Sequence, residues 1–136
     1  MKQKIFIMDS GILINFAMNG LLEVLENLKK SFNGKFIITK HVKYETIDKP
    51  LNIQRFELEA LRIKDLLDRK IIELPDSLGI PDSIINKKLY QLMGIANHFL
   101  HRGSDPIKIV SEGEMSCLAL SSVLSERGVE NIIGVD

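Results

Sequence analysis

Short apolar runs alternate with helical patterns along this chain of 136 residues. Unbroken apolar runs of this length are typical of strands that are covered on both faces. The unbroken run 5–8 therefore predicts a strand, and the short apolar segments 36–38, 71–74 and 132–135 predict three more. Helical patterns between these runs predict helices at 11–17, 21–28, 41–47 and 56–67, from Asp82 or Ser83 to Gly103, and from Ser111 to Gly128.

Three of the predicted helices carry an apolar stripe at intervals of three or four residues, which is one face of a helix. The stripe in 56–67 consists of Phe56, Ala60, Ile63 and Leu67. The long helix that follows presents Ile85, Leu89, Leu92, Ala96 and Phe99. In the last helix we expect Met115, Leu118, Ser122 and Val123 to face inward.

Strands that alternate with helices predict an α/β fold with three layers, in which helices cover both faces of a central parallel sheet. The length of 136 residues is that of a single domain, so we expect one domain spanning 1–136. Ligands of such sheets bind outside the carboxyl ends of the strands. The residues that directly follow each strand are therefore the ones to inspect for function.

Composition excludes several classes of protein. Hydrophobic residues make up 45% of the chain and charged residues 26%, which excludes wholesale disorder. The 18 basic and 18 acidic residues sum to zero, so bulk charge gives no argument for a nucleic-acid partner. The lone Cys117 excludes an internal disulfide and a thiolate-rich zinc site, and it fits a reducing compartment. No apolar stretch approaches the roughly 20 residues of a membrane span, so we expect a cytoplasmic protein.

Four acidic residues are predicted to meet at one edge of the sheet. Asp9 directly follows the first strand and Asp136 directly follows the last. Glu45 lies on the short helix after the second strand, and Glu114 lies in the first turn of the helix that precedes the last strand. Because that helix runs antiparallel to the strands, its first turn lies at their carboxyl edge as well.

Carboxylates that lie close together raise one another's pKa unless basic side chains or a cation compensate them. Ligation by oxygen alone suits Mg²⁺ or Mn²⁺. A cation held in this way can activate water against a phosphodiester. The pattern therefore indicates metal-dependent phosphodiester hydrolysis.

The four acidic motifs of the sequence resemble those of PIN domains. They are Met8-Asp9-Ser10, Glu45 after the second strand, Gly113-Glu114, and Val135-Asp136. PIN domains are metal-dependent ribonucleases, and they include the toxins of prokaryotic toxin–antitoxin pairs. The resemblance implies a catalytic metal-ligand role for Asp9, Glu45, Glu114 and Asp136, with Ser10 as a supporting polar residue. It also implies Mg²⁺ or Mn²⁺ as cofactor, RNA as substrate, an antitoxin-like protein as partner, and a homodimer.

The sequence departs from the family at its carboxyl end. The PIN fold continues past the fourth acid with a further helix and usually a last strand, whereas this sequence ends at Asp136. This leaves open whether the domain is truncated. The third acid is Glu114 where many relatives have Asp, and Glu112 is a possible substitute for it.

Each acid also has a structural interpretation. Asp9 could cap the helix that follows it, Glu45 could be a solvated surface charge, and Asp136 is a chain end. The sequence from Ser111 to Glu114 matches the S-x-x-E capping box. The alternative function is therefore a catalytically inactive PIN-like module that binds RNA or a protein.

Basic residues near Glu45 are candidates for guiding a phosphate backbone. Lys40 and Lys43 are the substrate-binding candidates together with Ser10. His41 precedes Glu45 by four residues on the same predicted helix face, where it could touch substrate. We expect Cys117 to lie in the core.

Overall fold

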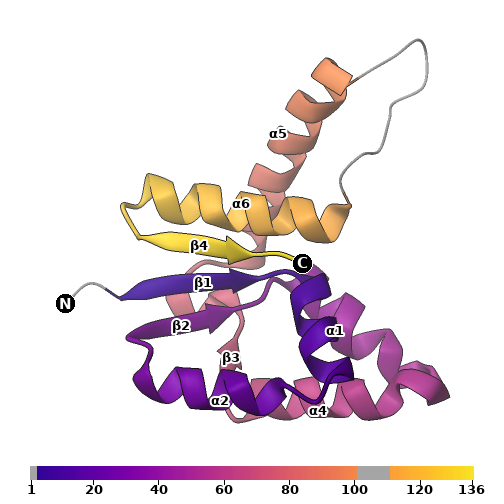
Figure 1. Cartoon of the computed structure of the whole chain (residues 1–136). Coiled ribbons are helices and arrows are strands. Elements are labelled where there is room, and N and C mark those ends of the chain that lie inside the picture. Colours follow the sequence, from indigo (N-terminus) through magenta and orange to yellow (C-terminus); the bar gives the residue numbers. More distant parts are fainter. Residues whose placement is uncertain (1–2, 101–110) are drawn as a thin grey trace.

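The computed structural model describes residues 3–100 and 111–136, and Figure 1 traces their path. Four parallel strands form one sheet in the order β3-β2-β1-β4. The strands are β1 (Lys4–Met8), β2 (Gly34–Ile37), β3 (Ile72–Glu73) and β4 (Asn131–Gly134). The four predicted strands are confirmed, with boundaries that shift by one or two residues.

Helices α1 to α6 flank this sheet, so the predicted three-layer α/β/α fold is confirmed (Figure 1). Contacts join α6 to β1 and β4, α2 to β2, and α4 to β3. The helices are α1 (Ser10–Met18), α2 (Leu22–Ser31), α3 (Lys40–Lys43), α4 (Glu57–Asp68), α5 (Asp82–Leu100) and α6 (Glu112–Glu126). The predicted end of the long helix at Gly103 lies outside the described residues.

The core is built around the two central strands. Ile7 of β1 is fully buried and is paired in register with Ile37 of β2 and Ile133 of β4. Since neighbouring strands are parallel, no strand of the sheet reverses, and all four end at the same edge. That edge is where Asp9 follows β1 and Asp136 follows β4.

The helix predicted at 41–47 is more complex than expected. It begins as α3 with Thr39 as its N-cap, whose Oγ1 accepts a hydrogen bond from the backbone N–H of Val42 at 3.2 Å. From Tyr44 to Asp48 the segment continues as one π-helical turn. Glu45 lies in this wider turn. Such turns occur frequently at functional sites.

The predicted stripes hold for most of their residues. Ala60 and Ile63 of α4, and Ile85 and Leu89 of α5, are each at most 2% exposed. The side chains of Ala96 and Phe99 lie outside the described residues. The prediction that Leu118 faces inward is wrong, because this side chain is 46% exposed.

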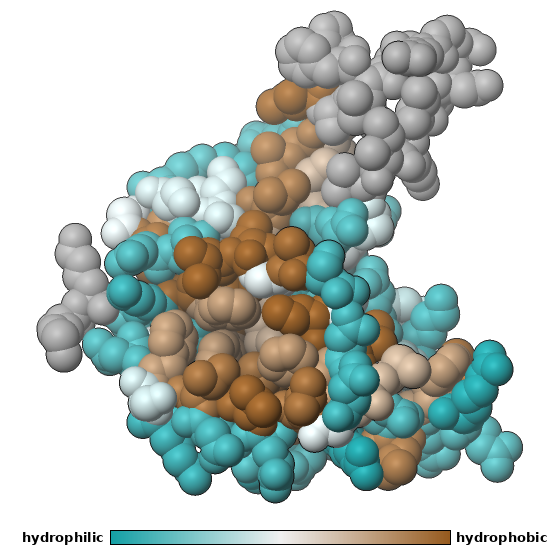
Figure 2. Space-filling view, in the orientation of Figure 1, coloured by the Kyte–Doolittle hydropathy of each residue, from teal (hydrophilic) through white to brown (hydrophobic). Residues whose placement is uncertain are grey.

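One face of the sheet presents a broad apolar surface, which Figure 2 shows in brown. Phe6 of β1 is partly buried on this face and makes an edge-to-face contact with Phe36 of β2, with ring centroids 5.7 Å apart. Its register partner Ile132 of β4 is 58% exposed. Strand β4 is thus an edge strand with an exposed apolar side chain.

Candidate functional site

A cavity of about 760 Å³ opens at the carboxyl edge of the sheet, and all four predicted acids line it. Asp9 and Asp136 reach it from the ends of β1 and β4, Glu45 from the π-helical turn, and Glu114 from the first turn of α6. The predicted supporting residue Ser10 lines the cavity too. The other lining residues are Gly11, Ser111, Cys117, Leu118, Ile133 and Val135. The structure therefore brings together five predicted residues from four segments that are distant in the sequence.

Asp9 is held rigidly at the end of β1. Its backbone N–H donates to the carbonyl oxygen of Gly134 at 3.0 Å, which extends the pairing of β1 with β4. Its carboxylate Oδ1 accepts a hydrogen bond from the backbone N–H of Ser10 at 2.8 Å and caps α1. The residue is only 9% exposed. Asp9 is thus a helix cap and a cavity wall at once.

The Glu45 carboxylate is fixed by a neighbour of Asp9. Ser10 Oγ donates a hydrogen bond to Glu45 Oε2 at 2.5 Å. Ser10 itself is 8% exposed. This contact links the start of α1 to the π-helical turn. Ser10, predicted as a supporting polar residue, thus supports the carboxylate of Glu45.

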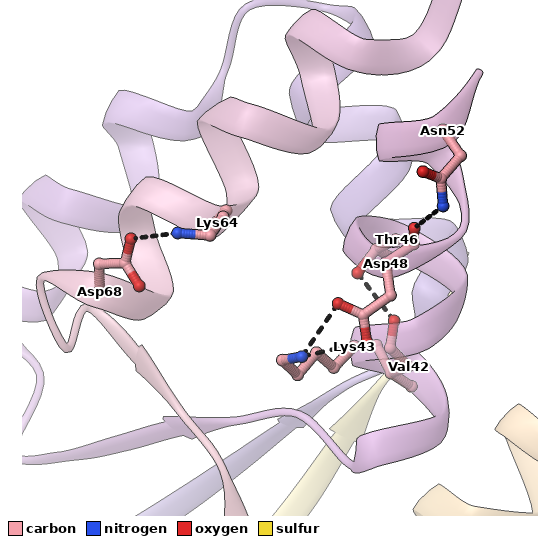
Figure 3. Close-up of polar contacts among 7 residues, drawn as sticks. All are labelled: Val42, Lys43, Thr46, Asp48, Asn52, Lys64 and Asp68. Atoms are coloured by element: carbon pink, nitrogen blue, oxygen red, sulfur yellow. Dashed lines mark hydrogen bonds and ion pairs between the residues drawn. The ribbon is translucent and has the colours of Figure 1, made fainter.

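The segment around Glu45 is braced by its own hydrogen bonds (Figure 3). Thr46 Oγ1 donates to the carbonyl oxygen of Val42 at 2.7 Å. Lys43 Nζ lies 3.0 Å from both carboxylate oxygens of Asp48, and Asn52 Nδ2 donates to the carbonyl oxygen of Asp48 at 3.2 Å. These contacts cross-link successive turns and hold the backbone that carries Glu45.

Glu114 belongs to a complete capping box. Ser111 Oγ accepts from the backbone N–H of Glu114, and Glu114 Oε2 accepts from the backbone N–H of Ser111, each at 3.2 Å. Glu114 is exposed. The capping interpretation of this glutamate is therefore confirmed, while its carboxylate also lies in the cavity wall.

Asp136 lies against the start of α1. A Cβ added to Gly11 would come within 3.0 Å of the Cβ of Asp136. The C-terminal end of the described sequence therefore lies beside the start of α1, as Figure 1 shows.

The acidic side chains of the wall make the electrostatic potential of the cavity negative. Within the described residues, no lysine, arginine or histidine lines it. Burial, followed by the negative charge of Asp9, raises the pKa of the Cys117 thiol to about 12. A hydrogen bond with Ser116 opposes this rise, and the charges of Glu45 and Glu114 add to it. Three of the four acids thus act on one thiol. Cys117 is 2% exposed, as expected of a core residue.

The two predicted substrate-binding lysines lie outside the cavity wall. Lys40 is exposed at the first position of α3, and Lys43 forms its ion pair with Asp48. His41 Nε2 lies 3.8 Å from Oε2 of Glu112, so the imidazole contacts α6 beside the cavity. The proposed substitute Glu112 likewise lies outside the cavity lining.

The donor set has the chemistry of a hard-cation site, because the four side chains offer only carboxylate oxygens and none of the described residues of the wall is basic. Among residues 3–100 and 111–136, however, no three side chains of Asp, Glu, His or Cys are placed to hold one ion. Mg²⁺ is usually bound by one or two carboxylates plus water, which this cavity can supply.

Three features of the cavity were missed by reasoning from the sequence. Gly113, buried on α6, lies directly against the Glu45 carboxylate. Cys117 and Leu118 form part of the wall. The motif Gly113-Glu114 contained the signal for the first, since a glycine inside a helix calls for a reason in packing.

No family model, no curated protein and no solved structure matches this chain. Within the part of the chain that the structure describes, none of the helices combines the length and the apolar character needed to cross a bilayer.

Proposed function

We propose that this protein is a Mg²⁺- or Mn²⁺-dependent endoribonuclease that resembles the PIN domains. The observation that carries the proposal is the cavity at the carboxyl edge of the sheet, where Asp9, Glu45, Glu114 and Asp136 line a wall to which the described residues contribute no basic side chain. Uncompensated carboxylates at one site are costly in the absence of a cation. A site of this kind is best explained by a ligand of positive charge.

In the proposed reaction, Asp9, Glu45, Glu114 and Asp136 would surround the cation, with one or two of them bound to it directly and the others acting through water, and Ser10 would orient Glu45. The chemistry that bound Mg²⁺ or Mn²⁺ supplies is activation of water and neutralisation of charge on the phosphodiester. Ser10 keeps Glu45 pointed into the cavity through the hydrogen bond to Oε2. The amide N–H of Ser10 keeps the Asp9 carboxylate at the end of β1.

The substrate, partners and location belong to the same proposal. RNA is the expected substrate, and Lys40, exposed at the start of α3, is available to a phosphate backbone. We expect a homodimer, an antitoxin-like protein as partner, and a cytoplasmic location. The single cysteine of the chain is consistent with a reducing compartment.

A second candidate is a catalytically inactive PIN-like module that binds RNA or a protein. This candidate is favoured because two of the acids have structural roles in the helices. Glu114 completes a capping box, and Asp9 caps α1. In this reading the carboxylates serve the helices, and the cavity holds no cation.

Calorimetric titration with Mn²⁺ separates the two candidates, with cleavage of a single-stranded RNA as the second measurement. The decisive variant is Asp9→Asn, because asparagine also caps helices and the fold should persist. Asp76→Asn is the matched control, since Asp76 is exposed in the turn Pro75–Leu78, outside the cavity.

We expect saturable Mn²⁺ binding and metal-dependent cleavage by the parent and by Asp76→Asn, and loss of both in Asp9→Asn. A parent protein without saturable Mn²⁺ binding would support the inactive module. Cleavage by Asp9→Asn at the parental rate would refute the proposed mechanism.

A further inference from the structure

Gly113 occupies a position where the backbone does not require glycine. It is the second residue of α6 and is buried. Its φ angle is not among the positive values found at Gly20, Gly79 and Gly128. In a helix, glycine is less favourable than alanine because it loses more conformational freedom on folding. The reason for this glycine must therefore lie in the space around it.

That space is filled by the carboxylate of Glu45. A Cβ built on Gly113 would lie 2.5 Å from Oε1, 2.9 Å from Oε2 and 3.0 Å from Cδ of Glu45. Real Cβ atoms do not approach other heavy atoms so closely. The carboxylate of Glu45 thus rests on the bare Cα of Gly113, and any larger residue would displace one of the two.

The side chain of Glu45 would give way, because helix α6 is anchored. Ser116 Oγ donates to the carbonyl oxygen of Gly113 at 2.6 Å and bonds to Thr39 Oγ1 at 2.7 Å. Thr39 and Ser116 are at most 1% exposed. Glu45, in contrast, contacts Gly113 with the end of a flexible side chain. A methyl group at position 113 would therefore move the carboxylate and break its hydrogen bond with Ser10.

We infer that Gly113 is a positioning residue, whose missing side chain sets the place of the Glu45 carboxylate in the cavity. This role rests on the proposed function, in which Glu45 is a metal ligand. Gly113 touches neither cation nor substrate in this proposal. It acts through Glu45, as outer-shell partners act on the ligands that they orient.

The test uses Gly113→Ala in two backgrounds, the parent and Glu45→Asp. Aspartate is one methylene shorter than glutamate, so its carboxylate stays clear of the new methyl group. Gly94→Ala is the matched control, because Gly94 lies within helix α5 and no described atom comes within 4 Å of an added Cβ. Each protein is measured by thermal unfolding without metal and by calorimetric titration with Mn²⁺.

Without metal, Gly94→Ala should raise Tm by about 2–5 °C through helix propensity alone. In the parent, Gly113→Ala should raise Tm clearly less than Gly94→Ala does. In the Glu45→Asp background, Gly113→Ala should raise Tm by as much as Gly94→Ala. Equal gains of Gly113→Ala in both backgrounds would overturn the inference, whether or not the protein binds a metal.

With Mn²⁺, Gly113→Ala should weaken binding by the roughly 10–100-fold typical of outer-shell changes. Gly94→Ala should leave the affinity at the parental value, and Gly113→Ala should add no further loss in the Glu45→Asp background. Parental affinity in Gly113→Ala would overturn the positioning role. A parent that binds no Mn²⁺ would overturn the proposed function instead, while the dependence of Tm on Glu45 would still support the contact.

Discussion

Ser116→Ala should destabilise the protein by breaking a buried link between the two helical segments that carry Glu45 and Glu114. Ser116 has one hydroxyl hydrogen, and the carbonyl oxygen of Gly113 accepts it at 2.6 Å. Thr39 must therefore be the donor in its 2.7 Å contact with Ser116. The substitution removes the only acceptor that the structure gives to this hydroxyl within the described residues.

The size of this destabilisation follows from the burial of the two hydroxyl groups. Thr39 is 1% exposed and Ser116 is fully buried, so water does not replace the lost partner. An unpaired buried hydroxyl costs about 1–3 kcal/mol. Alanine regains up to about 0.5 kcal/mol in helix propensity over serine. We therefore expect a net loss of about 1–2 kcal/mol in the free energy of unfolding.

Urea denaturation measures this loss, with Ser122→Ala as the control. Ser122 lies on the same helix and is half-buried, and its hydroxyl forms no hydrogen bond with the described residues. The control carries the same propensity gain without the loss of the acceptor. The double variant Thr39→Val with Ser116→Ala completes a double-mutant cycle, in which loss of the Thr39 cap cancels.

The cycle should give a coupling energy of about 1 kcal/mol or more between Thr39 and Ser116. Additive effects within about 0.5 kcal/mol would refute the reasoning, as would a Ser116→Ala protein as stable as Ser122→Ala. The link would then contribute nothing to the placement of α3 against α6.

Two further predictions concern α6 and its thiol. Ser111→Ala should lower the free energy of unfolding by about 1 kcal/mol in urea, because alanine lacks the hydroxyl oxygen that accepts a hydrogen bond from the backbone N–H of Glu114. An unchanged midpoint would contradict this role of the cap. Cys117 should resist an aromatic disulfide reagent at pH 8 in the folded protein, because its pKa is raised from 9.0 to about 12 and the thiol is buried. Since the folded state holds this proton more tightly than the unfolded state, the resulting stability is complete below pH 9 and declines as the pH rises towards 12. Rapid labelling at pH 8 or pH-independent stability between 9 and 12 would count against this environment.

The strands were predictable because each is a short, mostly apolar run, and the sheet buries most of the side chains of β1 and β2, though not those of the edge strand β4. Ile7 is fully buried, as an unbroken run from Ile5 to Met8 implies. The meeting of Asp9 and Asp136 also followed from the sequence, since each comes after a strand and parallel strands end at one edge. The capping box was predictable because it is local, with Ser111 and Glu114 only three residues apart.

The local conformation around Glu45 and the atomic contacts of its carboxylate were beyond prediction from the sequence. Nothing in the pattern around Glu45 distinguishes a π-helical turn from an α-helix, and the approach of its carboxylate to Gly113 joins residues 68 positions apart. The inward orientation of Leu118 was wrong because a regular stripe assumes a neighbouring layer. At that position α6 borders the cavity, so the side chain lies in its wall.

The carboxylate of Glu114 has two roles, because it completes the capping box of α6 and also lines the cavity. An ion that recruited this carboxylate fully would take the hydrogen-bond acceptor from the amide of Ser111. The loss of about 1 kcal/mol would weaken binding about fivefold. By linkage the effect is reciprocal, so occupancy of the cavity would loosen the first turn of α6, and a firmer first turn would disfavour occupancy. Binding of a cation should therefore speed up amide hydrogen exchange at the start of α6.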